Sequence, residues 1–254
     1  MDLANRPQLE ARFARRLGTT GARHRRELIE LLGNPPDERN VPQSFWDKVE
    51  QETAEDLLFF LLLIFAASST QHGLDSAASK QAAQDFAATR APEVARSFTQ
   101  TSQERLSNAT TRWQEQAEAA RKRAADAAKA AGESEAAQRR AGQSAADDAI
   151  SKSDIADEAT KIFGPSRVEG VAVSETTGAA SAGGELGTIQ TVGITDDDTW
   201  FTAHDARVCK ICAPLHGKKR SYWSRFFPNG PPAHVNCRCW IRYANEGLIG
   251  QEAA

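Results

Sequence analysis

The sequence predicts a mainly α fold, with an elongated helical N-terminal part and a small α+β module at the C-terminus. Residues 76–160 are rich in Ala, Gln, Glu, Arg and Lys, which are strong helix formers. All four cysteines lie between residues 209 and 239, and eight of the 18 aromatic residues lie between residues 200 and 243. A unit this small cannot bury a large core, so we expect aromatic packing and a bound metal ion to stabilise it.

Helix ends are marked by turn-forming residues. The first predicted helix carries many arginines and stops at Gly33, which precedes an Asn-Pro-Pro sequence. The second begins after Ser44, whose hydroxyl predicts a capping box, and ends near Gly73. Within residues 76–160, Pro92 and Gly132 predict interruptions.

Two helical segments indicate contacts beyond a single helix. The block Leu57–Phe65 is apolar on all sides, so it lies either in the core, the interpretation we favour, or on a surface buried upon assembly. In the later helix, alanines at a 3-4 spacing form one face that admits a close partner helix but buries little area per residue. We expect this face to complete its packing in an assembly. The alanines are Ala117, Ala120, Ala124, Ala127 and Ala131.

Composition divides the chain into three regions: a helical docking region over residues 1–165, a helix or linker of small residues over 166–199, and the Cys/His module with its tail over 200–254. By composition alone, residues 176–198 resemble a linker. The aspartates at 196–198 are predicted to form a solvated loop.

The cysteine segment predicts a tetrahedral zinc site. Cys209-Lys-Ile-Cys212 is a pair with a two-residue gap, and His234-Val-Asn-Cys237-Arg-Cys239 supplies the other half. Five donors are present for four positions; Cys209, Cys212, His234 and Cys237 are the first choice, with Cys239 able to replace either of the last two. A closed shell of four ligands leaves no position for a reacting water, so zinc is expected to be structural and the protein not to be an enzyme.

Charge and hydropathy limit the kinds of partner that the protein could bind. The net charge is −3, yet residues 204–242 contain eight lysines and arginines against one acid, which favours DNA or an acidic partner, or a solvated cationic surface. We predict such contacts at Lys218, Lys219, Arg220 and Arg225. The longest apolar run has 11 residues where a bilayer needs about 20, and no secretory signal is evident, so neither membrane contact nor disulfides are expected.

Two catalytic alternatives compete with the structural site. A zinc deaminase would need a His-x-Glu sequence, which is absent, and Pro214 follows the cysteine pair where a deaminase has it before. A zinc-dependent nuclease could use His204-Asp205 or His234-Val-Asn236, which is a weak signal. A stand-alone nucleic-acid-binding zinc module is the non-catalytic alternative.

Together, these motifs resemble the phage Mu F-like minor head proteins over about residues 168–243. The match includes Val171-Ala-Val-Ser-Glu175-Thr176, an Asp four residues before Cys-x-x-Cys, a Gly five residues after it, and the ending Pro-Pro-x-His-x-Asn-Cys-Arg-Cys. One departure is Asp198-Thr199 before Trp200, where Lys-Trp is usual. The residues that support the motif are Glu175, Asp205, Gly217 and Arg238.

The resemblance implies a structural minor head protein of a tailed phage or prophage, associated with the portal protein inside the capsid. It implies a role in head morphogenesis, and in DNA packaging or ejection. Expected partners are the portal, capsid or scaffold proteins and packaged DNA. The expected location is the virion head near the portal, and the host cytoplasm during assembly. The resemblance further implies that the segment after Ser174-Glu175-Thr176 forms a helix with small residues on one face.

Overall fold

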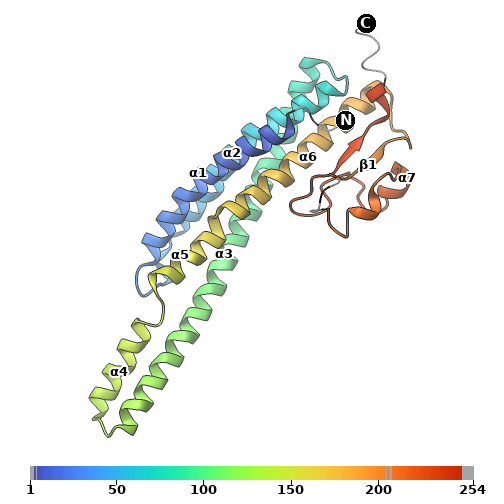
Figure 1. Cartoon of the computed structure of the whole chain (residues 1–254). Helices are drawn as coiled ribbons and strands as arrows, with labels where there is room; N and C mark the ends of the chain where they lie inside the picture. Colours follow the sequence, from blue (N-terminus) through green and yellow to red (C-terminus); the bar gives the residue numbers. More distant parts are fainter. Residues whose placement is uncertain (1–2, 4, 204, 206–207, 248–254) are drawn as a thin grey trace. The chain divides into compact units, whose positions relative to one another are not determined.

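The prediction of a mainly α protein with a small α+β module is confirmed. The computed structural model describes residues 3, 5–203, 205 and 208–247. Within them the chain forms seven α-helices and two short strands. The helices are α1 (Arg6–Leu32), α2 (Gln43–Gln71), α3 (Ser76–Ala130), α4 (Glu135–Asp147), α5 (Lys152–Phe163), α6 (Pro165–Thr191) and α7 (Arg220–Trp223); the strands are β1 (Thr199–Phe201) and β2 (Trp240–Arg242) (Figure 1).

Contacts divide the chain into two units. The first unit contains Met1–Gly18, Glu52–Ala95 and Val168–Ala254, and the second contains Thr19–Gln51 and Arg96–Arg167. Helices α1, α2 and α3 therefore each contribute residues to both units. The division of the sequence into three consecutive regions stays a prediction, but the Cys/His module shares the first unit with segments of four long helices.

Glycines with positive φ mark the helix ends. Gly33 (φ 74°), Gly73 (φ 95°) and Gly132 (φ 77°) follow α1, α2 and α3, as the sequence predicts. The interruption predicted at Pro92 is wrong, because α3 continues through this residue. A proline removes one backbone hydrogen bond of the helix. Ala91 and Ala95, which lie near Pro92 on α3 and are almost fully buried, hold the helix in place.

The predicted capping box at Ser44 is also wrong. Helix α2 begins at Gln43, so Ser44 lies inside its first turn. A capping box instead begins α5, where the Ser151 hydroxyl accepts from the Asp154 backbone N–H and the Asp154 carboxylate accepts from the Ser151 N–H.

The core of the first unit is built on α2. Leu57, Leu61 and Ile64 are fully buried, and the ring of Phe60 stacks on that of Phe13 with centroids 4.6 Å apart. The favoured core interpretation of the apolar block is thus confirmed for one side of the helix. The other side is exposed at Leu58 (39%), Phe59 (56%) and Leu63 (38%), residues that we call the α2 apolar stripe. Helix α2 is also long and apolar enough to cross a membrane, although half of its most apolar window is buried inside the protein.

The small-residue segment is a helix and not a linker. Helix α6 spans residues that composition alone assigns to a linker, because its glycines let it pack closely on α2. A Cβ atom at Gly183 would lie 2.5 Å from the Phe65 carbonyl oxygen, and one at Gly187 would lie 2.6 Å from that of Ser69. The Ser68 hydroxyl donates to the Ala180 carbonyl at 2.6 Å across the same contact. Tertiary packing here overrides the low helix propensity of glycine.

We expect Gly183→Ala to destabilise the protein by about 2 kcal/mol, although alanine is the better helix former. The added methyl would meet the backbone of α2, which cannot move aside as a flexible side chain would. Gly178→Ala is the matched control, since its Cβ would lie 3.4 Å from Pro232 in ordinary contact. Urea unfolding of both variants tests this, and equal stabilities would show that the α2–α6 contact tolerates a wider spacing.

The second unit has its own aromatic cluster. The ring of Phe163 on α5 lies within 6.5 Å of those of His24, Phe45 and Trp46, measured between centroids.

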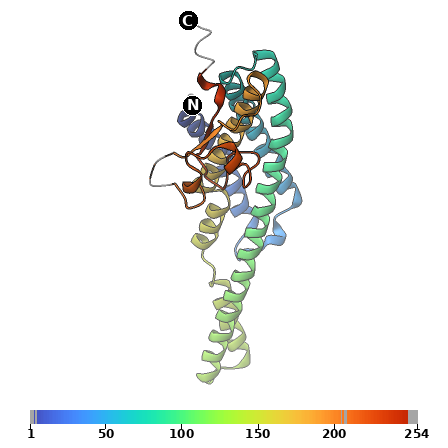
Figure 2. The same cartoon turned by 90° about the vertical axis from the view of Figure 1, so that its right-hand side faces the viewer.

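Helix α4 lies beside the C-terminal part of α3 in both views (Figures 1 and 2). A Cβ at Gly142 would lie 3.0 Å from the Arg121 carbonyl oxygen, so these two helices also pack closely. In the predicted alanine face, Ala117, Ala120 and Ala124 are half-buried, and Ala127 and Ala131 are exposed.

Candidate metal centre

Strands β1 and β2 form the frame of the C-terminal module. They pair antiparallel, with Trp200 opposite Ile241. The Trp200 N–H donates to the Lys218 carbonyl, and the Gly217 N–H donates to the Trp200 carbonyl at 2.8 Å. Gly217 has φ of 72°, a conformation that favours glycine, so this residue returns the chain from the Cys-x-x-Cys turn to β1. The frame brings the first cysteine pair next to the segment that precedes β2.

The five predicted donors form two groups of three. Cys209, Cys212 and His234 make one group, and Cys212, Cys237 and Cys239 make the other; within each group the ligand atoms lie within 4.8 Å of one another. Cys212 belongs to both. The Sγ atoms of Cys212 and Cys237 are 3.8 Å apart. Two thiolates at tetrahedral positions on zinc, with Zn–S bonds of about 2.3 Å, are separated by about 3.8 Å. The two thiols therefore fit zinc in type and spacing, and the imidazole fits it in type.

The ring of His234 is oriented for metal binding. Its Nδ1 lies 2.7 Å from the Val235 carbonyl oxygen, which can only accept, so Nδ1 carries the proton. The Nε2 atom is then free to bind a metal, and it lies 3.0 Å from the sulfurs of both Cys209 and Cys212. The Cys212 backbone N–H also donates to the Cys209 sulfur at 3.4 Å. A carbonyl that fixes the tautomer and an amide that supports a sulfur are usual around bound metals.

Hydrogen bonds among the thiols shift their pKa values in opposite directions. Hydrogen bonds from Cys212 and Cys239 lower the pKa of Cys237 to about 2. The hydrogen bond to Cys237 raises the pKa of Cys212, with Cys239 and burial contributing in the same direction. A cluster in which one thiol ionises readily favours binding of a dication, because metal binding displaces protons from its ligands.

Residues far away in sequence hold the closing segment. The Thr177 hydroxyl on α6 donates to the Cys237 carbonyl. The Arg6 guanidinium on α1 donates to the Cys239 carbonyl at 3.4 Å, and the Asn236 N–H donates to the Ser174 hydroxyl at 2.9 Å. In both views the module lies beside α6 (Figures 1 and 2). Sequence reasoning missed these contacts, since nothing in the pattern of Arg6 or Thr177 points to a cysteine more than 50 residues away.

The motif-supporting residues have separate structural roles. The Asp205 carboxylate accepts two hydrogen bonds from Arg238, at 2.6 and 2.7 Å, and this contact raises the pKa of Arg238. Arg238 lies between two candidate ligands in sequence, so the pair ties the segment before Cys209 to the closing turn. Glu175 is away from the donors and pairs with Arg90 on α3 at 2.8 Å. His204, the residue named in the nuclease alternative, lies outside the described residues.

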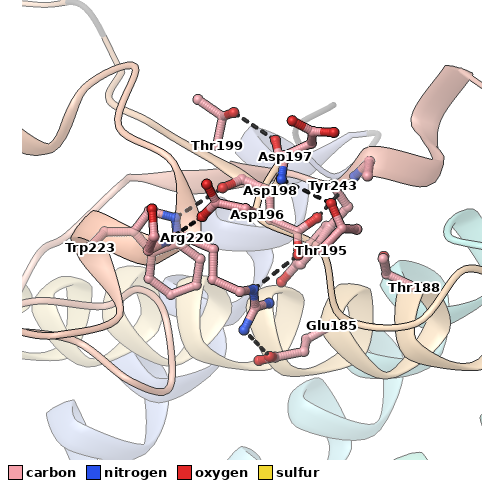
Figure 3. A network of polar contacts seen from close by, with 12 residues as sticks. Glu185, Thr188, Thr195, Asp196, Asp197, Asp198, Thr199, Arg220, Trp223 and Tyr243 are labelled. Carbon is pink, nitrogen blue, oxygen red and sulfur yellow. Dashed lines mark hydrogen bonds and ion pairs between the residues drawn. The ribbon is translucent and has the colours of Figure 1, made fainter.

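The aspartates at 196–198 are not simply a solvated loop, and for Asp198 that prediction is wrong. Asp198 is fully buried, and its carboxylate accepts from Arg220 Nε at 3.0 Å and from the Ala244 N–H at 2.9 Å (Figure 3). Its backbone carbonyl accepts from the indole of Trp223 at 3.0 Å. Arg220 also donates to Glu185 on α6 at 2.8 Å, so one arginine joins α6, the segment before β1 and α7.

The four predicted partner-binding cations therefore divide into two kinds. Arg220 is held inside the module with a side chain 13% exposed, and Lys219 pairs with Asp197 at 2.9 Å. Lys218 and Arg225 are exposed. Binding of a partner by any of the four stays a prediction, and the geometry leaves Lys218 and Arg225 as the cations most accessible to a partner.

The fold and site define a helical protein with a small cysteine–histidine module suited to a metal. A family model described as Phage Mu protein F like protein matches residues 71–242, so the chain belongs to this family. The family is one of phage head proteins, which makes the chain a virion component that assembles with other virion proteins. No curated protein and no solved structure matches the chain significantly.

Proposed function

We propose that this protein is a non-enzymatic minor head protein that binds the portal protein inside the capsid and acts in head morphogenesis. Membership of the phage head family supports the general role. The observation that carries the specific role is the α2 apolar stripe, where Leu58, Phe59 and Leu63 remain exposed on a helix whose opposite side is the core.

The stripe has the properties of an assembly contact. Phe59 packs edge-on against the buried Phe60 with ring centroids 5.1 Å apart, so the exposed ring is supported from beneath. The half-buried Leu62 and Ala66 extend the apolar surface along the same helix. Clustered exposed apolar side chains on a rigid support mark protein–protein contacts, and a portal protein inside the head is the partner that fits a head protein.

Zinc takes a structural role in this proposal. Four of the five donors Cys209, Cys212, His234, Cys237 and Cys239 would hold the ion, which would supply folding free energy to the module. Among the described residues, the groups able to hold a metal contain cysteines and a histidine, the ligands of structural zinc sites. Capsid or scaffold proteins would be further contacts. The protein would assemble into heads in the host cytoplasm. Inside the head it would contact packaged DNA and act in DNA packaging or ejection.

We expect replacement of the stripe, as in Phe59→Ser/Leu63→Ser, to remove the protein from assembled heads. Loss of one buried aromatic anchor weakens protein contacts by about 2 kcal/mol or more, about 30-fold in affinity. Proteomics of purified heads and binding to purified portal protein are the two measurements.

The matched control is Ile194→Ser, which removes an apolar side chain that is 67% exposed elsewhere in the first unit. It should leave incorporation unchanged. Absence of the unmodified protein from heads would exclude the head-protein role. Normal incorporation of the stripe variant would place the portal contact on another surface.

A further inference from the structure

We propose that Cys239 is one of the metal ligands of the C-terminal module and that Trp200 positions its sulfur. From spacing alone, Cys239 is a substitute for His234 or Cys237 and not a first choice. The inference rests on the metal site of the proposed function. It does not depend on the portal contact, and its test uses purified protein.

The spacing of the sulfur atoms favours Cys239 as a ligand. A metal ion that binds Cys212 and Cys237, whose sulfurs are 3.8 Å apart, fits the separation of two tetrahedral thiolates. The sulfur of Cys239 lies within 4.8 Å of both, so it is in place for the third position. Among the described residues, neither Cys209 nor His234 forms such a group of three with that pair. One of these two would supply the fourth ligand.

The strand pairing turns Cys239 toward Trp200. Trp200 on β1 lies opposite Ile241 on β2, and residues two apart along a strand face the same side. Cys239 immediately precedes β2 and lies two residues before Ile241, so it faces the side of Trp200. Burial agrees, because these three residues are at most 4% exposed, whereas Arg242 on the other side is exposed.

The indole of Trp200 offers a hydrogen-bond donor to this sulfur. Its N–H is buried and makes no hydrogen bond of ordinary geometry with a described residue. It makes a weaker contact with Cys239. Contacts with Cys212 and with this indole lower the pKa of Cys239, but Cys237 and burial outweigh them and raise it to about 12. A thiolate accepts more strongly than a thiol, so metal binding by Cys239 would satisfy the buried N–H.

Packing and backbone contacts fix the direction of the indole. The Trp200 ring packs against those of Trp223 and Phe227, with centroids 5.9 and 5.7 Å away. The backbone N–H of Trp200 donates to the Lys218 carbonyl, and its carbonyl accepts from the Gly217 N–H. A donor held in place beside a ligand atom is the kind of contact that orients metal ligands.

The deciding experiment is cadmium–proton correlation NMR on the reduced full chain, loaded with cadmium in place of zinc. Cadmium binds the same soft donors, and scalar coupling through the metal–sulfur bond marks the β-protons of each bound cysteine. We expect couplings to Cys212, Cys237 and Cys239. Couplings to Cys209, Cys212 and Cys237 without Cys239 would overturn the proposal. This measurement needs no substitution that could unfold the module.

A double-mutant cycle tests whether Trp200 acts through Cys239. Trp200→Phe removes the N–H and keeps an aromatic ring, and it should weaken zinc affinity about tenfold in competition with a chelator. In a Cys239→Ala background the same change should leave zinc affinity unaltered, because the indole has lost the sulfur that it positions. An equal loss in both backgrounds would overturn the positioning role.

Trp223→Phe is the matched control. Trp223 is almost as buried as Trp200, but its indole donates to the Asp198 carbonyl and not to a sulfur. Any change in zinc affinity that it causes should be the same with and without Cys239. If Trp200→Phe does not fold, the Trp200 indole proton of the unmodified chain replaces it. Its NMR signal should move downfield as zinc binds, and an unmoved signal would overturn the role of Trp200.

Failure of this inference is distinguishable from failure of the proposed function. Binding of cadmium without coupling to Cys239 would overturn the inference alone and leave a structural metal site. No binding of either metal would overturn both the metal site and the inference. Neither result bears on incorporation into heads, which is measured separately.

Discussion

Cys212→Ser should abolish metal binding and unfold the C-terminal module. Cys212 is the member shared by the two donor groups, so no set of ligands survives its loss without rearrangement. A structural zinc supplies about 10–16 kcal/mol in small metal domains, which is more than the stability of most domains. The fluorescence of Trp200 and Trp223, both almost fully buried, reports the folding of the module, and elemental analysis reports the metal.

Cys239→Ser is the informative companion variant. It should retain the metal if Cys209, Cys212, His234 and Cys237 are the ligands, and lose it if Cys239 is one of them. Chelation of the unmodified protein should reproduce the loss of tryptophan signal and preserve the helical circular dichroism of the second unit. A Cys212→Ser variant that keeps one metal ion per chain and a native tryptophan spectrum would contradict the assignment.

Features with local causes could be predicted from the sequence. The ends of α1, α2 and α3 follow from glycines that adopt positive φ, a property of the residue itself. The donor cluster follows likewise from the spacing of Cys209 and Cys212 and of the residues after His234. Prediction from local signals fails where one residue type fits two structures. Ser44, for example, could cap a helix or lie within its first turn, and it lies within the first turn of α2.

Features that depend on distant partners could not be predicted. Residues 176–191 look like a linker until α2 supplies a surface that Gly183 and Gly187 can approach. Similarly, Asp198 has the composition of a solvated loop, and only the fold brings Arg220 to it. Lys219 and Arg220 are adjacent in sequence and looked equivalent, yet one is exposed and the other is nearly buried.

The α2 apolar stripe shows a third limit of prediction from the sequence. A block that is apolar on all sides predicts burial, and Leu57, Leu61 and Ile64 fulfil that prediction. The amount of covering surface that the rest of the chain provides cannot be read from the block itself. The structure covers one side of α2 in the first unit and leaves Phe59 exposed, which is why an assembly contact is proposed there.

Asp198→Ala should destabilise the module by about 3 kcal/mol, because it removes the fully buried carboxylate that accepts from Arg220 and leaves this guanidinium with Glu185 as its remaining partner. The same change also removes the acceptor of the Ala244 N–H. The loss should appear as an earlier transition of tryptophan fluorescence in urea, at an unchanged metal content below the transition.

Two further variants separate the causes. Asp197→Ala breaks an ion pair whose side chains are 58% and 72% exposed, so it should change stability little. Asp198→Asn/Arg220→Met removes the buried charges together and should recover part of the stability lost in Asp198→Ala, since replacing both members of a buried pair is far less harmful than removing one. If Asp197→Ala were as damaging as Asp198→Ala, the cause would be the backbone of residues 196–198 and not the buried charge.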